Sequence, residues 1–316
     1  MSIPRRLSAA LCAPLLAVAL ASLPACKSQE PEPAPKPLVV VSVLPQAFAV
    51  ERIGSGLVRI EVMIPPGASP AVYEPTIEKL GAIERASAYV KVGHPAFPFE
   101  AAWLDRLLRG RNDLTVVDTT GDAVTDDHDP HVWLAPVQMR AMARSIHAAL
   151  VDILPLEHKQ TLDENLEIFL AEIDTVETFC RRTLEPARGN RFFVFHPAWG
   201  YFASAYGLEQ VAIESHGKEP DAHSLSRLIA EARESAVKVI FVQPQMNHAG
   251  ADLVAEEIGA RVERLDPLAY EWSDNLKAAA RLLADGSVPS PASAGEPPEA
   301  ANNMPTADPL TAPPAP

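Results

Sequence analysis

The sequence contains little cysteine and no excess of positive charge. There are three cysteines, and two of them lie at or before residue 26, so the folded part can form no internal disulfide and no Cys-rich zinc site. Lysine and arginine number 27 against 41 aspartates and glutamates, a formal net charge of -14, which argues against nucleic acid bound through its phosphates. The His-Glu-x-x-His pattern of many zinc hydrolases is also absent.

Long apolar runs are equally scarce, and the one that approaches a membrane span lies at the N-terminus. Two arginines precede the run 7–23, which is short for a transmembrane helix and ends in small residues, as in a signal peptide. It closes on Leu-Pro-Ala-Cys26, which resembles a bacterial lipobox. We therefore expect residues 1–25 to be a lipoprotein signal peptide and Cys26 to be lipidated. Ordinary signal cleavage next to a stray cysteine is the alternative.

Proline-rich segments flank the region that is expected to fold. Residues 26–37 alternate proline with polar residues, which predicts a stiff tether between the lipid and the fold. Residues 287–316 hold nine prolines and few large apolar side chains. Such a segment buries too little surface to offset the entropy of ordering, so we expect a disordered tail.

Between these segments, short apolar runs alternate with helix-length segments. Runs that are apolar on both faces and separated in this way indicate parallel sheets built from βα units. The expected strands are 38–44, 58–64, 88–92, 114–118, 191–195, 210–214, 237–243 and 261–265. Four strands in each half predict an α/β protein with two similar lobes, at 38–136 and 187–286, each with a four-stranded, mostly parallel sheet flanked by helices.

The middle of the chain, residues 137–186, is expected to connect the lobes. A helix is predicted at 137–153, and apolar residues at helical spacing predict a longer one at 156–184. The longer helix would measure roughly 43 Å, more than one small lobe requires, so we interpret it as a rigid rod joining both lobes. Cys180 belongs to its apolar stripe and is expected to fill the core rather than to react.

Four polar residues follow predicted strands or lie in a loop of the same sheet edge, where open α/β sheets bind ligands. They are His94, His131, His196 and Asp266, two from each lobe. Three imidazoles and one carboxylate would suit a four-coordinate Zn²⁺ site, whereas Mn²⁺ prefers more oxygen ligands. Each of these residues could instead have a purely structural role, such as a histidine held in a loop or, for Asp266, a helix cap.

Several segments, in order, resemble the solute-binding proteins of zinc and manganese ABC importers, the ZnuA/TroA-like metal-binding lipoproteins. The resemblance runs from about residue 38 to residue 283. It is carried by 66–76 (PGASPAVYEPT), 129–134 (DPHVWL), 196–202 (HPAWGYF), 217–220 (GKEP), 237–245 and 265–267 (LDP). It implies two α/β lobes bridged by one long helix, a metal in the cleft between them, and delivery of that metal to an ABC permease.

One departure from the family pattern concerns a metal ligand. The resemblance implies a metal-binding histidine where this sequence has Ala71, and alanine cannot ligate a metal. His94 follows the next strand along the chain, and both loops leave the same edge of one sheet. We hypothesise that His94 takes the vacant position. His216 is a reserve candidate, and Asp129 or Glu214 could accept the second ring N–H of a ligand histidine.

These observations predict a monomeric binding protein that captures a divalent metal, zinc in first place, outside the cytoplasmic membrane. A manganese-specific or iron-binding protein of the same type remains an alternative. A zinc hydrolase with an open coordination position is the alternative from another class, because loss of a ligand at Ala71 would open the site. An adhesin or assembly factor that uses its proline-rich tail is a third.

Overall fold

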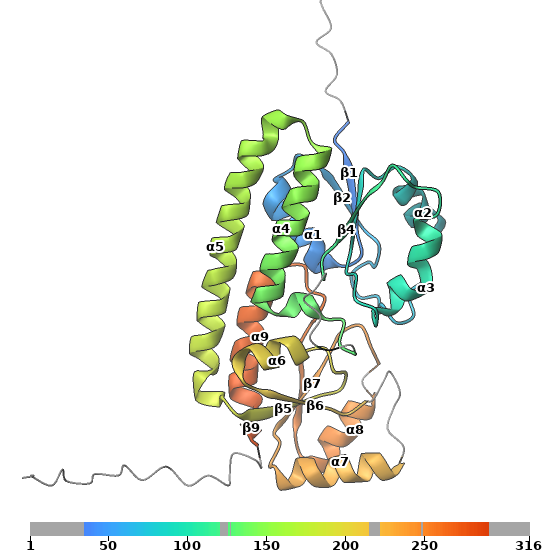
Figure 1. The fold of residues 1–316 in the computed structure, drawn as a ribbon. Coiled ribbons are helices and arrows are strands. Elements are labelled where there is room, and N and C mark those ends of the chain that lie inside the picture. The colour runs from blue at the N-terminus through green and yellow to red at the C-terminus, as the bar shows by residue number, and fades with distance from the viewer. Residues whose placement is uncertain (1–34, 121–125, 127, 215–221, 248, 291–316) are drawn as a thin grey trace, which may run out of the picture. The chain divides into compact units, whose positions relative to one another are not determined.

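The computed structural model describes residues 35–120, 126, 128–214, 222–247 and 249–290. The predictions on the signal peptide, Cys26 and His216 lie outside the described residues, as does the tail from residue 291 onward. Within them, two mostly parallel sheets flanked by helices are joined by one long helix (Figure 1). The predicted fold class is therefore confirmed.

The first sheet has the strand order β2-β1-β3-β4, with all pairs parallel. Its elements are β1 (Leu38–Val41), α1 (Leu44–Gly54), β2 (Arg59–Val62), α2 (Ile77–Glu84), β3 (Ala88–Lys91), α3 (Pro98–Leu107) and β4 (Thr115–Asp118). Every residue of the central strand β1 is buried, whereas the edge strands β2 and β4 are partly exposed. This difference explains the continuous apolar run of β1, since a central strand has helices or loops over both faces.

The second sheet repeats this order as β6-β5-β7-β8 and adds a fifth strand. Its elements are β5 (Asn190–Val194), α6 (Gly200–Tyr206), β6 (Glu209–Ala212), α7 (Ala222–Glu234), β7 (Val239–Val242), α8 (Ala249–Ile258), β8 (Arg261–Arg264), α9 (Trp272–Gly286) and β9 (Val288–Pro289). The short β9 pairs antiparallel with β5. All eight predicted strands are present, but four strands for this lobe was one too few.

Strand β9 also corrects the expected start of the C-terminal tail. The composition placed the tail from residue 287, yet Val288 pairs with Arg191 and the Ser290 hydroxyl donates to Glu209 at 3.0 Å. Strand β7 pairs with β5 only at Phe193 and Val194, so the start of β5 can pair with another strand, which composition alone does not reveal. The described fold therefore extends to Ser290.

The connecting region consists mainly of two helices. They are α4 (Pro136–Ile153) and α5 (Lys159–Leu184), the latter preceded by the 3-10 turn η3 (Leu156–His158) and followed by η4 (Glu185–Ala187). The 26 residues of α5 span about 39 Å at 1.5 Å per residue. In Figure 1, α5 runs beside the helices of both sheets, and it packs on α1, α4 and α9.

Cys180 lies in the buried stripe of α5, as the helical spacing predicted. Its side chain has no exposed surface, and its sulfur lies 3.6 Å from the carbonyl oxygen of Leu276. Burial raises the pKa of the thiol to about 11. The thiolate, which is the reactive form, is therefore scarce near neutral pH.

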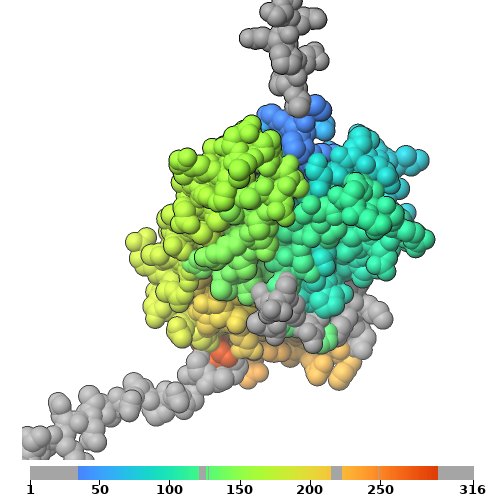
Figure 2. Space-filling model, turned by 45° about the horizontal axis from the view of Figure 1, so that its top comes forward, coloured from blue at the N-terminus to red at the C-terminus, as the bar shows by residue number. Residues whose placement is uncertain are grey.

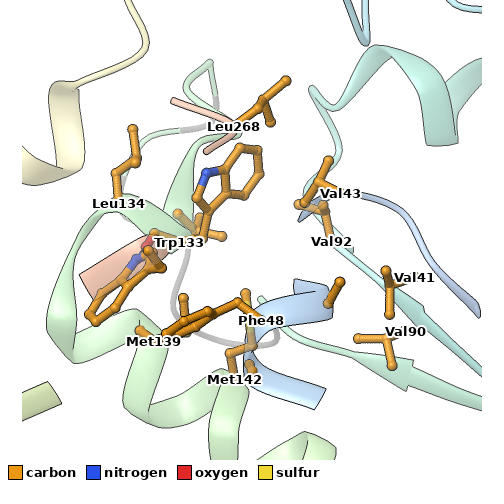
Figure 3. Packing of buried hydrophobic residues seen from close by; sticks show 14 of the residues in the cluster. Val41, Val43, Phe48, Val90, Val92, Trp133, Leu134, Met139, Met142 and Leu268 are labelled. Atoms are coloured by element: carbon orange, nitrogen blue, oxygen red, sulfur yellow. Dashed lines mark hydrogen bonds between the residues drawn. The ribbon is translucent and has the colours of Figure 1, made fainter. Parts of the chain in front are cut away.

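The main apolar core extends through both lobes, and a smaller one lies in the second lobe alone. A single cluster of buried side chains includes Val40 of β1, Phe169 of α5 and Phe192 of β5. Figure 3 shows Trp133 within this cluster, between Leu268 of the second lobe and residues of the first. On the face drawn in Figure 2, the first lobe and helices α4 and α5 meet without a gap.

Polar contacts also cross the same junction, and those of two tryptophans are buried. The Trp133 indole N–H donates to the carbonyl of Pro267 at 2.7 Å, and the Trp272 indole N–H donates to the carbonyl of Trp133 at 2.7 Å. On α5, the Glu172 carboxylate accepts from Arg52 of α1 at 3.2 Å and from Ser273 of α9 at 2.6 Å. The two tryptophan bonds join the lobes directly, and Glu172 links one helix of each lobe through α5.

Candidate metal site

The structure brings together two of the histidines predicted from the sequence. His131 precedes the 3-10 turn η2 (Val132–Leu134), and His196 comes two residues after β5. Their ring centroids are 5.5 Å apart, with the ring planes at 79°. Because the parallel strands end at this edge of each sheet, side chains from both lobes converge here. Two imidazoles at this separation can face one ion.

A buried carboxylate holds His131. The Nδ1–H of His131 donates to Oδ1 of Asp129 at 2.7 Å, and the backbone N–H of His131 donates to the same oxygen at 3.0 Å. Both side chains are largely buried, with 11% of His131 and 8% of Asp129 exposed. A proton on Nδ1 leaves the Nε2 lone pair free for a metal, the usual arrangement of a ligand histidine.

His196 has the same kind of support from the second lobe. Its Nδ1 lies 2.5 Å from Oε1 of Glu214, whose side chain is 3% exposed. The sequence left open whether Asp129 or Glu214 accepts a ring N–H, and in the structure each serves one histidine. These carboxylates fix the orientation of both rings before any ion arrives.

The Asp266 side chain and backbone are held by other groups. Its Oδ1 accepts from Gln245 Nε2 at 2.6 Å and from the backbone N–H of Leu268 at 2.9 Å, and its carbonyl accepts from Asn275 at 2.7 Å. Within the described part of the chain, no three His, Cys, Asp or Glu side chains are grouped closely enough to hold a metal. The structure thus gathers His131 and His196 but does not complete the predicted four-residue set.

His94 is buried, and both of its ring nitrogens have partners. Nδ1 accepts from the backbone N–H of Ala96 at 3.1 Å, and Nε2 lies 2.9 Å from the carbonyl oxygen of Asp126, to which it donates. Sequence spacing could not reveal these bonds, since they depend on how the chain folds back after β3. As placed, His94 must release one partner before it can bind a metal.

A buried glutamate fixes the turn that carries His94. Glu100 accepts from the backbone N–H of Val92 at 2.6 Å and of Gly93 at 2.8 Å, and from the Ser42 hydroxyl at 2.5 Å. Burial raises the pKa of this carboxyl, and the hydrogen bonds oppose the rise. Gly93 is required here because its φ is 82° and a Cβ would lie 2.1 Å from Oδ1 of Asp118.

Ala71, where the family resemblance implied a histidine, lies in an exposed turn. Between the loops of the first lobe and Leu268 of the second, a cavity of about 10 Å³ remains, room for one water at most. It is lined by Val43, Leu44, Ile64, Pro65, Gly67 and Leu268. An open hollow of about 600 Å³ along the last turns of α5 contains none of the predicted site residues.

Large aromatic side chains in the two segments that carry the histidines are buried. Trp133, Trp199, Tyr201 and Phe202 are all buried, and the ring centroids of Trp133 and His131 are 5.4 Å apart. An apolar surrounding excludes water from the site and strengthens the interaction of an ion with its ligands. Gln245, whose side-chain amide donates to Asp266, was not predicted as a site residue, although it lies in a segment that carries the family resemblance.

Comparisons with known proteins agree with this architecture. Residues 39–285 match the family described as "Zinc-uptake complex component A periplasmic". The high-affinity zinc uptake system protein ZnuA of Bacillus subtilis is 28% identical over 249 residues, covering 73% of this chain and 78% of the relative. The ZnuA protein of Yersinia pestis is 28% identical over 263 residues, with coverages of 73% and 82%.

Solved structures of the same group superpose on most of the chain. A crystal structure of ZnuA has a TM-score of 0.75 and 36% identity, covering 79% of this chain and 98% of the other. A zinc-bound deletion mutant of ZnuA has a TM-score of 0.74 and 36% identity, with coverages of 81% and 99%. These proteins are binding components of uptake systems and not enzymes, which sets aside the hydrolase alternative. The chain belongs to the ZnuA family of periplasmic zinc-uptake components.

Proposed function

We propose that this protein captures one zinc ion outside the cytoplasmic membrane and delivers it to an ABC permease. The observation that carries the proposal is the pair His131 and His196, each with its Nδ1 on a buried carboxylate from its own side of the site. Two oriented imidazoles with free Nε2 atoms suit Zn²⁺ better than Mn²⁺, which prefers oxygen ligands. The names of the relatives support the same metal.

The proposed ligand set has a core and two additions. The core is Nε2 of His131 and Nε2 of His196. Asp266 would add its Oδ2, because the bonds that its carboxylate accepts from Gln245 and Leu268 both fall on Oδ1. His94 would add Nδ1, because a proton on Nε2 already donates to the Asp126 carbonyl, the arrangement that a ligand histidine needs.

Replacing His94 with alanine tests the last of these ligands. Binding through Nδ1 gives up the hydrogen bond from Ala96, which contributes about 0.5–1.5 kcal/mol. We therefore expect His94→Ala to lower zinc affinity by about 10-fold, less than the loss of a core histidine. Competition titration with a zinc-binding dye measures it. Unchanged affinity would remove His94 from the ligand set and leave the core untouched.

The remaining parts of the proposal concern placement and partners. We propose that residues 1–25 direct export, that a lipid on Cys26 anchors the protein and that residues 26–37 are the tether. The lobes would span residues 38–136 and 187–290, joined by 137–186, and the protein would act as a monomer. None of the helices in the described part of the chain has the length and apolar character to cross a membrane.

A metal titration of the exported part, residues 27–316, tests the proposed function. After removal of metal by a chelator, we expect one zinc ion to bind per chain, more tightly than manganese. Affinity should fall on acidification because protons compete for the imidazole nitrogens. Calorimetry with each metal, combined with elemental analysis, measures stoichiometry and preference. A chain that binds no zinc, or prefers manganese, would contradict the proposal.

A further inference from the structure

A glycine in the second lobe lies against the carboxylate that holds His131. Gly200 is the first residue of α6, four residues after His196. Its φ lies outside the left-handed region, so the backbone conformation does not require glycine. Space does. A Cβ built on Gly200 would lie 2.6 Å from Oδ2 of Asp129, closer than real Cβ atoms approach.

The close approach involves only this carboxylate oxygen. The next atoms around the same Cβ position, Cγ of Asp129 and Nε2 of Gln210, are 3.7 Å away, which is ordinary van der Waals contact. Asp129 cannot move aside freely, because its side chain is 8% exposed and its Oδ1 accepts two bonds from His131. Any side chain at position 200 would therefore displace the carboxylate from His131.

The segment that carries Gly200 is also fixed. The backbone N–H of Trp199 donates to Gln210 at 2.7 Å, and the backbone N–H of Ala198 donates to the carbonyl of His196 at 2.9 Å. His196 itself is held by Glu214. The contact of Asp129 with Gly200 is thus a point where the loop that carries His131 touches the segment that carries His196.

We infer that Gly200 is a positioning residue of the metal site. Because Gly200 has no side chain, the Asp129 carboxylate can pack against the second lobe. This packing keeps the two imidazoles at their 5.5 Å separation. The inference rests on the proposed function, since it assigns Gly200 to the site that would take zinc. It concerns geometry between the lobes, because Gly200 itself offers no ligand atom.

A double-mutant cycle tests this role. We expect Gly200→Ala to lower zinc affinity by about 10–100-fold, the usual effect of disturbing a group that orients a metal ligand. With the carboxylate removed by Asp129→Ala, the added methyl group has nothing to displace, so Gly200→Ala should then change affinity by less than about 3-fold. Additive losses, or full affinity in Gly200→Ala alone, would overturn the inference.

A matched control and a second measurement separate positioning from general damage. Gly81 lies in helix α2, where a Cβ would meet only the end of the Arg85 side chain at 3.3 Å, so Gly81→Ala should bind zinc like the wild type. In zinc-free protein, the NMR signal of the His131 Nδ1 proton should shift in Gly200→Ala while that of His196 stays. Equal shifts of both signals, or of neither, would overturn the inference.

The outcomes also separate this inference from the proposed function. Wild-type protein that binds no zinc would contradict the proposed function whatever the variants do. Wild-type protein that binds zinc, with additive losses in the cycle, would overturn only the role of Gly200. If Gly200→Ala fails to fold, the variant that combines it with Asp129→Ala is the test. Restored folding and a restored His196 ring signal in that double variant support the inference. Failure of both variants to fold overturns it.

Discussion

Replacing His196 with alanine should lower the affinity for zinc by at least about 100-fold. The imidazole is a proposed core ligand, and its loss should exceed the 10–100-fold effect that is usual for groups outside the coordination sphere. The fold should survive, because the His196 side chain is 24% exposed and lies at the edge of the sheet. His131→Ala should behave in the same way. Competition titration measures affinity, and circular dichroism checks the fold.

A partly buried histidine outside the candidate site provides the matched control for these variants. His147 lies on α4 with its Nε2 2.9 Å from Asp163 of α5, the two main helices of the connecting region. His147→Ala should leave zinc affinity unchanged. Glu214→Gln should lower zinc affinity by an intermediate amount, about 10–100-fold, because it disturbs the orientation and proton position of His196. Equal zinc affinity in His196→Ala and His147→Ala would remove His196 from the site.

Replacing Trp133 with alanine should destabilise the whole protein by about 3–5 kcal/mol, the usual cost of deleting a large buried aromatic side chain. Trp133 has no exposed surface, and its indole donates across the lobe junction to the Pro267 carbonyl. The loss leaves a cavity and an unpaired carbonyl in the shared core. Urea unfolding monitored by circular dichroism measures the free energy of unfolding.

A tryptophan away from the junction is the control for this prediction. Trp103 lies on α3, is only partly buried, and is covered on one face by the Arg106 guanidinium at 4.5 Å from its ring centre. Trp103→Ala should lower the free energy of unfolding clearly less than Trp133→Ala does. If Trp133→Ala unfolded the lobes in two separate steps with little loss in one of them, the shared core would not be what couples them.

The local pattern of the chain predicted the strands and the long helix well. All eight strands inferred from apolar runs are present, with ends that differ by up to three residues. The prediction succeeds because central strands such as β1 are buried on both faces and must be apolar throughout. The helix α5 was recognised because its apolar stripe repeats at helical spacing over 26 residues.

The local sequence did not predict features that depend on partners far away along the chain. Strand β9 has only two residues, and its pairing with β5 arises from the position of the chain after α9. The bridge made by Glu172 between Arg52 and Ser273 joins residues more than a hundred positions apart, and nothing in the local sequence marks it. Such contacts form only when whole elements are packed together.

The candidate site shows the same division between sequence and structure. The sequence by itself determined the residue types at the strand ends, and therefore that imidazoles and carboxylates would gather at one edge of each sheet. Only the tertiary structure decided which of them converge. It placed His131 beside His196 and bound both nitrogens of His94 to backbone groups. The positions of the strands along the chain follow from the local apolar pattern, whereas side-chain partners depend on how the two lobes pack against each other.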